Sequence, residues 1–147
     1  MAKVGKYIKE IVLFFIVLFI ITNGISLYRS SSMQLSDGVC EGGADMIHFF
    51  ATWCPVCELE APNIDRVSKH FNIVSVAVKS KDIDEYMAKN RYSFAYIDDI
   101  NGSLAKEADI QAFPTTITCK DKKVFFVDVG YTSTFGLYLK LFLAKVL

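Results

Sequence analysis

The hydrophobic residues of this chain form one long run near the N-terminus and several shorter runs after it. Residues 11–27 contain seventeen residues without a charge. A helix of this length is about 25 Å long, close to the lower limit for crossing a hydrocarbon core about 30 Å thick. A helix from Ile8 to Leu27 reaches about 30 Å and places Tyr7 and Tyr28 where interfacial aromatic residues are usual. The run therefore predicts a transmembrane helix.

Charged residues on either side of this run predict its orientation. Three lysines lie within residues 1–10 and only Arg29 follows the run closely, so the positive-inside rule places residues 1–10 in the cytoplasm and residues 11–28 in the membrane. A cleavable signal peptide is the alternative. An uncleaved anchor is favoured because the run is longer than the usual signal-peptide core and no A-x-A cleavage site is present.

The pattern after the anchor predicts a tether and one folded domain. Residues 29–44 are rich in serine and glycine, and residues 45–147 alternate between strand-like and helix-like segments. The order of these segments, which ends in a hairpin, predicts an α/β fold with a mixed sheet flanked by helices. Strands are expected at 46–51, 72–78, 93–97, 115–119 and 124–129, and helices at 81–90, 103–108, about 133–146 and from Pro55 onward.

Two of the expected helices have informative faces. The helix from Pro55 has an apolar and a polar side, and Pro62 within it is expected to kink it. The helix at about 133–146 is apolar nearly all round, so packing on the sheet is expected, with contact to a partner or to the membrane surface as the alternative. The expected apolar side of the first helix contains Val56, Leu59, Ile64, Val67 and Phe71, and its polar side contains Glu58, Glu60, Asp65, Arg66 and Lys69.

The composition of the chain narrows the possible classes of protein. Its length of 147 residues allows one domain and a short appendage. Apolar residues make up 52% of the chain, and 16 basic residues balance 16 acidic ones. These values exclude an intrinsically disordered chain and give no electrostatic footprint for nucleic acid. No nucleic-acid partner is therefore expected.

Two of the four cysteines are separated by two residues where an expected strand meets an expected helix. Cys54 falls at the helix N-terminus, where unpaired backbone N–H groups and the helix dipole stabilise a thiolate. In such motifs the thiol pKa falls from about 8.5 to between about 3.5 and 7.5. Cys57 is expected to be less exposed and to attack a mixed disulfide formed on Cys54. The sequence Trp53-Cys54-Pro55-Val56-Cys57 therefore predicts a redox-active pair.

Other interpretations of this pair remain open. A structural disulfide is one, and half of a zinc site is another. The chain has no second C-x-x-C, and His48 and His70 lie at no recognisable zinc spacing, so neither a metal nor a cofactor is expected. A Cu(I) chaperone using the same thiolates belongs to a different class, but no Met-rich or His-rich tract supports it.

Two stretches of the sequence resemble a known family. FFATWCPVCELEAP, residues 49–62, resembles the strand, active site and kinked helix of the thioredoxin superfamily, in particular its membrane-anchored TlpA-like thiol-disulfide oxidoreductases. FAYIDDINGSLAKEADIQAFPTT, residues 94–116, resembles the segment that leads to the cis-proline of that family. The resemblance covers about residues 45–131. It implies a thioredoxin-like fold behind the N-terminal transmembrane helix.

The resemblance also implies roles for residues around the cysteines. Pro114 is expected to be a cis-proline that faces the pair, so that a substrate segment pairs with the backbone of Phe113 as a short added strand. The sequence alone is equally compatible with a trans proline. The catalytic residues implied are Cys54, Cys57 and Pro114, and the implied neighbours are Trp53, Pro55, Val56, His48, Glu60, Phe113 and Thr115.

Two of these neighbours carry open alternatives. His48 lies six residues before Cys54, where thioredoxin has a buried acid. Its imidazole is a candidate proton acceptor for Cys57, and a core histidine hydrogen-bonded to backbone is the alternative. Glu60 matches an acidic residue that related reductases place near the pair, where it would raise the cysteine pKa values. A solvated glutamate on the helix face is the alternative.

The remaining cysteines are Cys40 and Cys119. In a thioredoxin-like sheet the strand after the cis-proline runs antiparallel to the strand before the active site, which brings Cys119 toward the start of that strand. A second disulfide is then geometrically possible in an oxidising compartment. A buried free Cys119 and a mobile Cys40 are the alternatives.

The expected protein is a disulfide oxidoreductase on the outer face of a bacterial cytoplasmic membrane, held there by its own helix. Cys54 attacks, Cys57 resolves and Pro114 positions the substrate. The resemblance implies a reductase of exported protein disulfides that receives electrons from a membrane partner. A disulfide oxidase is the nearest alternative, because the residues between the cysteines do not fix the reduction potential.

Overall fold

The computed structural model describes residue 7, residues 9–14, residues 16–17 and residues 37–147. The chain divides into two units, Met1–Gln34 and Leu35–Leu147, and the described residues of the first unit are helical. None of the helices among the described residues combines the length and the apolar content that a membrane span requires. Most of the predicted span at 11–28 lies outside the described residues.

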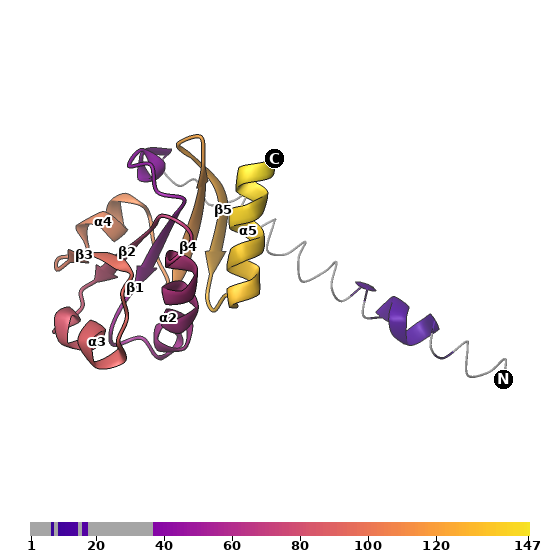
Figure 1. Cartoon of the computed structure of the whole chain (residues 1–147), viewed down its shortest axis with the longest axis horizontal. Coiled ribbons are helices and arrows are strands. Elements are labelled where there is room, and N and C mark those ends of the chain that lie inside the picture. Colours follow the sequence, from indigo (N-terminus) through magenta and orange to yellow (C-terminus); the bar gives the residue numbers. More distant parts are fainter. Residues whose placement is uncertain (1–6, 8, 15, 18–36) are drawn as a thin grey trace. The chain divides into compact units, whose positions relative to one another are not determined.

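The second unit is built on a five-stranded sheet with the order β3-β2-β1-β4-β5 (Figure 1). Parallel pairing joins β1 to β2 and β2 to β3, whereas β4 runs antiparallel to both β1 and β5. The mixed sheet and the order of its elements confirm the prediction. The elements are η1 (Asp37–Cys40), β1 (Met46–Phe50), α2 (Pro55–Ser68), β2 (Ile73–Val78), α3 (Ile83–Asn90), β3 (Ala95–Asp99), α4 (Ser103–Glu107), β4 (Thr115–Lys120), β5 (Lys123–Val129) and α5 (Thr134–Val146).

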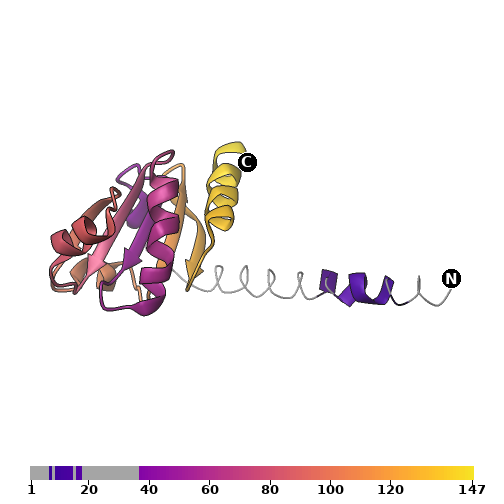
Figure 2. The ribbon, with the colours of Figure 1, turned by 60° about the horizontal axis from the view of Figure 1, so that its bottom comes forward.

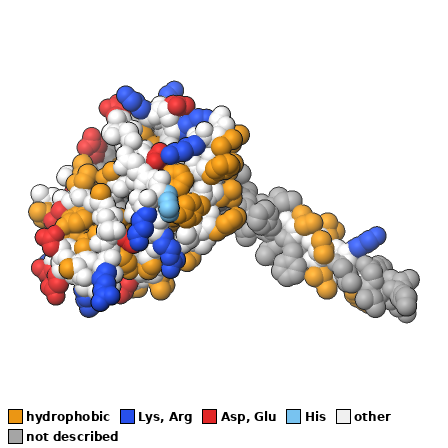
Figure 3. All heavy atoms as spheres, in the orientation of Figure 1, with side chains coloured by type: hydrophobic (Ala, Val, Ile, Leu, Met, Phe, Trp, Pro, Cys, Tyr) orange, Lys and Arg blue, Asp and Glu red, His pale blue; other side chains and the backbone are white. Residues whose placement is uncertain are grey.

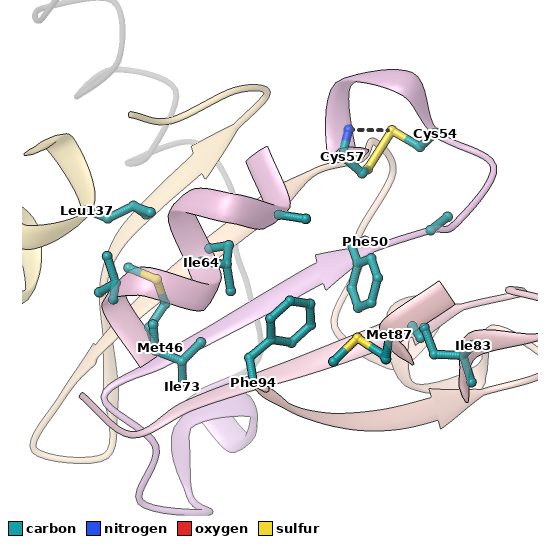
Figure 4. Packing of buried hydrophobic residues seen from close by; sticks show 14 of the residues in the cluster. Met46, Phe50, Cys54, Cys57, Ile64, Ile73, Ile83, Met87, Phe94 and Leu137 are labelled. Atoms are coloured by element: carbon teal, nitrogen blue, oxygen red, sulfur yellow. Dashed lines mark hydrogen bonds between the residues drawn. A yellow bond between two sulfur atoms is a disulfide. The ribbon is translucent and has the colours of Figure 1, made fainter. Parts of the chain in front are cut away.

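Helices cover both faces of the sheet. α2 and α5 lie side by side on one face (Figures 1 and 2), where α3 adds Ile83 and Met87 to the same hydrophobic cluster. The other face is covered by α4 and η1. All five residues of β1 are buried, because its side chains alternate between the two covered faces. Figure 4 shows the cluster under α2, which extends up to the cysteine pair.

The inner face of α2 matches the predicted apolar side at Ile64 and Val67 but differs from it at Val56 and Leu59. Its buried stripe contains Cys57, Ala61 and Ile64, spaced by four and three residues, whereas Leu59 is 69% exposed and Val56 is exposed as well. Small residues form much of this stripe. The prediction was wrong for Val56 and Leu59 because it relied on size and hydrophobicity. Glu60, predicted on the polar side, is fully buried.

Strand β3 begins two residues later than predicted, at Ala95 instead of Ser93. The Asp65 carboxylate of α2 accepts hydrogen bonds from the Ser93 backbone N–H at 2.7 Å and from its hydroxyl at 3.1 Å. Because these bonds occupy the N–H and the hydroxyl of Ser93, the pairing with β2 begins only at Ala95. Asp65 was also predicted on the polar side of α2, and it is buried instead.

The folded unit takes in part of the predicted tether at 29–44. Residues 37–40 form η1, and Cys40 is buried and forms a disulfide with Cys119 of β4. The Asp45 carbonyl then accepts a hydrogen bond from the Cys119 N–H at 2.9 Å. The disulfide and the packing of η1 fix this segment on the sheet, which the serine- and glycine-rich composition did not reveal.

The carboxylate of Asp99 caps the short helix α4. It accepts hydrogen bonds from the Ala105 N–H at 3.0 Å and from the Ser103 hydroxyl at 3.2 Å. Burial alone would raise the pKa of Asp99, but hydrogen bonds from the Ala105, Leu104 and Ser103 groups hold it below the usual 3.8. A lowered folded-state pKa stabilises the fold above pH 3.8, and this contribution disappears as the pH falls through the folded-state value.

We expect Asp99→Asn to lower the free energy of unfolding at neutral pH by about 1–2 kcal/mol, because an amide accepts these bonds less strongly than a carboxylate. The difference from the parent chain should shrink when urea unfolding is repeated below pH 3.8. Asp98→Asn, at the exposed neighbouring position, serves as the control. A pH-independent difference between Asp99→Asn and the parent would contradict the assignment.

Candidate active site

The Cys54–Cys57 pair lies where β1 ends and α2 begins. Cys54 is the N-cap residue of α2 with extended backbone angles, Pro55 occupies the first turn, and Cys57 follows within that turn. The two cysteines form a disulfide with their Cα atoms 5.2 Å apart. Figure 4 shows the bond together with the hydrogen bond that the Cys57 N–H donates to Cys54 Sγ at 3.2 Å.

The two sulfur atoms have different surroundings. Cys54 is 7% exposed, whereas Cys57 is fully buried. The Cys54 sulfur is therefore the one that a protein substrate can reach. Because it accepts the Cys57 N–H at the positive end of α2, a thiolate on Cys54 is stabilised by the helix N-terminus.

The second wall of the site is the turn that precedes β4. The Phe113–Pro114 peptide bond is cis, as the sequence analysis expects. The carbonyl oxygen of Phe113 lies 3.7 Å from Cys54 Sγ. Thr115 is buried and donates its hydroxyl to the Ala112 carbonyl at 2.8 Å, which closes the turn. The turn thus places the backbone of Phe113 beside the disulfide.

The loop before the cysteines is held by the segment after β2. The Trp53 indole N–H donates to the Lys79 carbonyl at 3.2 Å, and the Thr52 N–H donates to the Ser80 hydroxyl at 3.0 Å. The Trp53 ring packs edge-on against Phe113 with centroids 6.0 Å apart. Trp53 nevertheless remains mostly exposed. The Lys79 and Ser80 contacts could not be predicted from the sequence, because they depend on where β2 ends.

His48 and Glu60 meet beneath the site, and both are fully buried. His48 Nε2 lies 3.3 Å from Glu60 Oε2, in a contact that lacks the alignment of a hydrogen bond. His48 Nδ1 lies 3.2 Å from Ser75 Oγ, and Glu60 Oε1 accepts the Thr132 N–H at 2.7 Å. The alternative of a solvated Glu60 is therefore wrong. The alternative of a backbone-bonded His48 is also wrong, because its partners are side chains.

Aromatic rings surround the His48 imidazole. It stacks on Phe50 at a centroid distance of 5.1 Å and meets the edge of Phe94 at 6.5 Å. Tyr86 packs on Phe50 in turn. Burial, followed by the nearby charges of ionised Tyr92 and Glu58, raises the pKa of Tyr86 to about 12, so its phenol stays neutral. Phe50 and Phe94 carry no charge, and Glu60 is the acidic side chain in contact with His48.

Two partners of the buried pair were missed by the sequence reasoning. Ser75 stands opposite His48 in the parallel register of β1 and β2, a signal that a register prediction would have supplied. Thr132 follows β5 and lies 72 positions after Glu60, and no local sequence signal indicates that contact. Among the described residues, no group of three or more His, Cys, Asp or Glu side chains is placed to hold a metal ion.

Comparison with known proteins identifies the family to which this chain belongs. The model of the AhpC/TSA family matches residues 27–129, well over half of the chain. The chain belongs to the AhpC/TSA family. Solved structures with similar folds include StoA from Bacillus subtilis, with a TM-score of 0.59 and 22% identity over 65% of this chain and 79% of that one. The fold is therefore thioredoxin-like.

Further similarities point to the same group of proteins. A secreted disulfide oxidoreductase of Mycobacterium tuberculosis has a TM-score of 0.60 and 19% identity over 67% of this chain and 79% of that one. The thioredoxin-like protein of Haemophilus influenzae is 34% identical over 68% of this chain and 62% of its own length. The thiol-disulfide oxidoreductase ResA of Oceanobacillus iheyensis is 31% identical over 61% of this chain and 50% of its own length. This AhpC/TSA chain thus spans between half and two thirds of those two relatives.

Proposed function

We propose that this chain is an extracytoplasmic thiol-disulfide oxidoreductase of the membrane-anchored TlpA-like type, which reduces disulfides in exported proteins. The observation that carries the proposal is the Cys54–Cys57 pair at the start of α2, with the Cys57 N–H on Cys54 Sγ and the Phe113 carbonyl 3.7 Å from the same sulfur. The names of the relatives, which include thiol-disulfide oxidoreductases, support this class of activity.

In the proposed reaction the pair starts as two thiols. The Cys54 thiolate attacks one sulfur of a substrate disulfide, which forms a mixed disulfide and releases the other substrate sulfur as a thiolate. Cys57 then loses its proton and attacks Cys54 Sγ, which breaks the mixed disulfide and releases the second substrate sulfur. Two electrons pass to the substrate, and the pair ends as the disulfide seen in Figure 4.

The surroundings of Cys54 suit a protein substrate. Trp53, Val56 and Leu59 are exposed apolar side chains on the segment that contains the disulfide, and we call them the apolar rim. On the other side, the backbone of Phe113 offers its polar groups to an extended segment, with Pro114 setting the direction of the turn. Apolar contact with the rim and backbone pairing with Phe113 would together hold a substrate strand across Cys54.

The direction of electron flow is tested by the reduction potential of the Cys54–Cys57 pair. We expect equilibration with a series of glutathione redox buffers to give a value near the −270 mV of thioredoxin, which suits a reductase supplied by a membrane electron-transfer partner. A value near the −120 mV of DsbA would show an oxidase instead. Stoichiometric Cu(I) binding without insulin reduction would favour a copper chaperone.

The proposed location follows from the apolar run at 11–28 and the lysines before it. A single helix at 11–28 would hold the domain on the outer face of a bacterial cytoplasmic membrane. The full chain should then remain in membranes after a carbonate wash. A processed soluble form that begins near residue 27 would contradict the anchor and show a signal peptide.

We further propose that the buried pair of His48 and Glu60 takes the proton from Cys57. Glu60 follows Cys57 by three residues on the buried face of α2, a spacing that brings side chains within about 5–6 Å of each other at Cβ. Its carboxylate contacts His48 at 3.3 Å. Because Cys57 and this pair are all fully buried, the pair offers an internal destination for the proton when bulk water has no direct access.

We expect His48→Phe to slow insulin reduction by about tenfold or more, because general acid–base groups contribute this much or more to such steps. The pH profile of the rate should change as well. Urea unfolding of the variant separates a loss of stability from a loss of rate, and Ser75→Ala, which removes only the Nδ1 partner, provides the matched control. An unchanged rate and pH profile in His48→Phe would exclude the proton-acceptor role.

A further inference from the structure

The last helix, α5, has two apolar faces. Leu137, Leu141 and Ala144 are buried against the rest of the domain. On the opposite side a second stripe, which we call the outer stripe of α5, is between 45% and 76% exposed. Figure 3 shows hydrophobic side chains gathered along the edge of the domain where α5 lies in Figure 1. The outer stripe consists of Phe135, Leu139, Phe142 and Val146.

The spacing of the outer stripe makes it continuous. Its residues follow one another by four, three and four positions, which keeps them on one line of the helix over about 16 Å. Two bulky phenylalanines and two branched aliphatic side chains therefore face outward together. Single exposed apolar residues are normal on protein surfaces, but an ordered line of four indicates a contact surface.

The charges of α5 are placed beside the stripe and not within it. The helix contains no acidic residue. Lys140 is paired with Asp128 at 2.5 Å, and Lys145 lies 3.5 Å from Asp45. Both lysines are thus held at the flanks of the helix. The outer stripe therefore presents no carboxylate of its own to an apolar surface, and flanking lysines are typical of helices that lie at a lipid interface.

The C-terminal end of α5 lies at the end of the sheet where the chain enters the domain. Lys145 contacts Asp45, and the Asp45 carbonyl accepts a hydrogen bond from the Cys119 N–H. Cys119 is bonded to Cys40, at the end of η1. Figure 1 shows η1 and the C-terminal end of α5 at the same end of the sheet. The outer stripe thus ends close to the point where the chain comes in.

The chain between the proposed anchor and the domain is short. The proposed anchor ends at residue 28 and the folded unit begins at Leu35. Even fully extended, the intervening residues span at most about 25 Å. The entry point of the domain, and with it one end of α5, is therefore always within reach of the bilayer surface if residues 11–28 are anchored.

We propose that α5 lies on the lipid surface of the membrane that holds the anchor, with its outer stripe inserted at the boundary between headgroups and acyl chains. This inference rests on the anchor in the proposed function. An interfacial helix buries its apolar face about 5–10 Å into this boundary. Docking through α5 gives the domain one orientation on the membrane and holds the Cys54–Cys57 pair at a fixed height, which suits exchange with a membrane partner.

The experiment uses the full chain in vesicles of phosphatidylcholine and phosphatidylglycerol. Phe142→Trp is combined with Trp53→Phe, so that position 142 carries the only tryptophan. We expect blue-shifted emission, and loss of most of it when phosphatidylcholine brominated high on its acyl chains is used. The matched control places tryptophan at Ile100, which is 69% exposed compared with 59% for Phe142; its emission should be unaffected by the bromine.

Other outcomes overturn the proposal. Floated chains whose tryptophan at 142 is not quenched by bromine show that lipid does not cover the stripe. If that tryptophan is also blue-shifted and the chains cross-link as dimers, a second copy covers it. Chains that do not float with the vesicles contradict the anchor and the docking of α5 together. Insulin reduction by the parent chain, which keeps Trp53, then shows that the redox activity does not depend on the anchor.

Discussion

We expect Cys54→Ser to abolish the reduction of insulin disulfides, whereas Cys57→Ser should form the mixed disulfide with the substrate and go no further. In Cys54→Ser the remaining thiol of Cys57 is fully buried and is not reachable by a substrate disulfide. In Cys57→Ser the more accessible Cys54 still forms the mixed disulfide, but no neighbouring thiol resolves it. Non-reducing gels and mass spectrometry of the trapped complex measure the difference.

This experiment tests which of the two cysteines attacks the substrate and which resolves the mixed disulfide. A trapped complex from Cys54→Ser instead of Cys57→Ser would reverse the assignment of attacking and resolving thiol. Cys40→Ser combined with Cys119→Ser controls for nonspecific thiol exchange, because that disulfide is buried at the other end of β1. This control chain should still reduce insulin wherever it remains folded.

The position of the reactive pair could be predicted because its causes are local. A buried strand, a first-turn proline and two cysteines one turn apart define the N-terminus of α2, and the structure places Cys54 at its N-cap. The order of strands and helices followed from hydrophobic periodicity in the same way. Local patterns of this kind do not depend on which distant segment lies opposite.

The inner face of α2 was predicted correctly at Ile64 and Val67 and incorrectly at its first turns, for a physical reason. Size and hydrophobicity pointed to Val56 and Leu59, but the face that meets the sheet must accept Cys57 and lie close to β1. Small residues such as Ala61 suit that close approach. The large apolar residues Val56 and Leu59 are left exposed on α2, where the proposed function gives them a substrate to contact.

The environment of Glu60 could not be predicted because it is made by distant segments. Burying a carboxylate is costly unless it is paired and hydrogen-bonded. Here the pairing requires His48 from β1 and the Thr132 N–H from the loop before α5. Each contact depends on tertiary packing, so the charge of Glu60 alone favoured the surface. A buried acid beside a buried histidine is therefore a feature that only the folded chain reveals.

The second disulfide is expected to contribute far more to stability than the first. Cys40 and Cys119 are 79 positions apart, whereas Cys54 and Cys57 are 3 apart. In the chain-entropy description, closing the longer loop stabilises the fold by about 4.5 kcal/mol and closing the shorter one by about 1.6 kcal/mol. Replacing Cys40 and Cys119 with serine should therefore lower the free energy of unfolding by the larger amount, measured by urea unfolding of the oxidised chains.

The matched control is the chain with serine at positions 54 and 57, which retains the Cys40–Cys119 bond. Counting free thiols in the denatured, non-reduced parent should give none if both disulfides form, and two if Cys40 and Cys119 stay reduced. Equal losses of stability in the two double variants would show that η1 is not tied to β4 in solution. A larger loss of stability in Cys40→Ser with Cys119→Ser would instead assign separate roles to the two disulfides. The Cys40–Cys119 bond would stabilise the fold, and the Cys54–Cys57 bond, which lies apart from it, would exchange electrons.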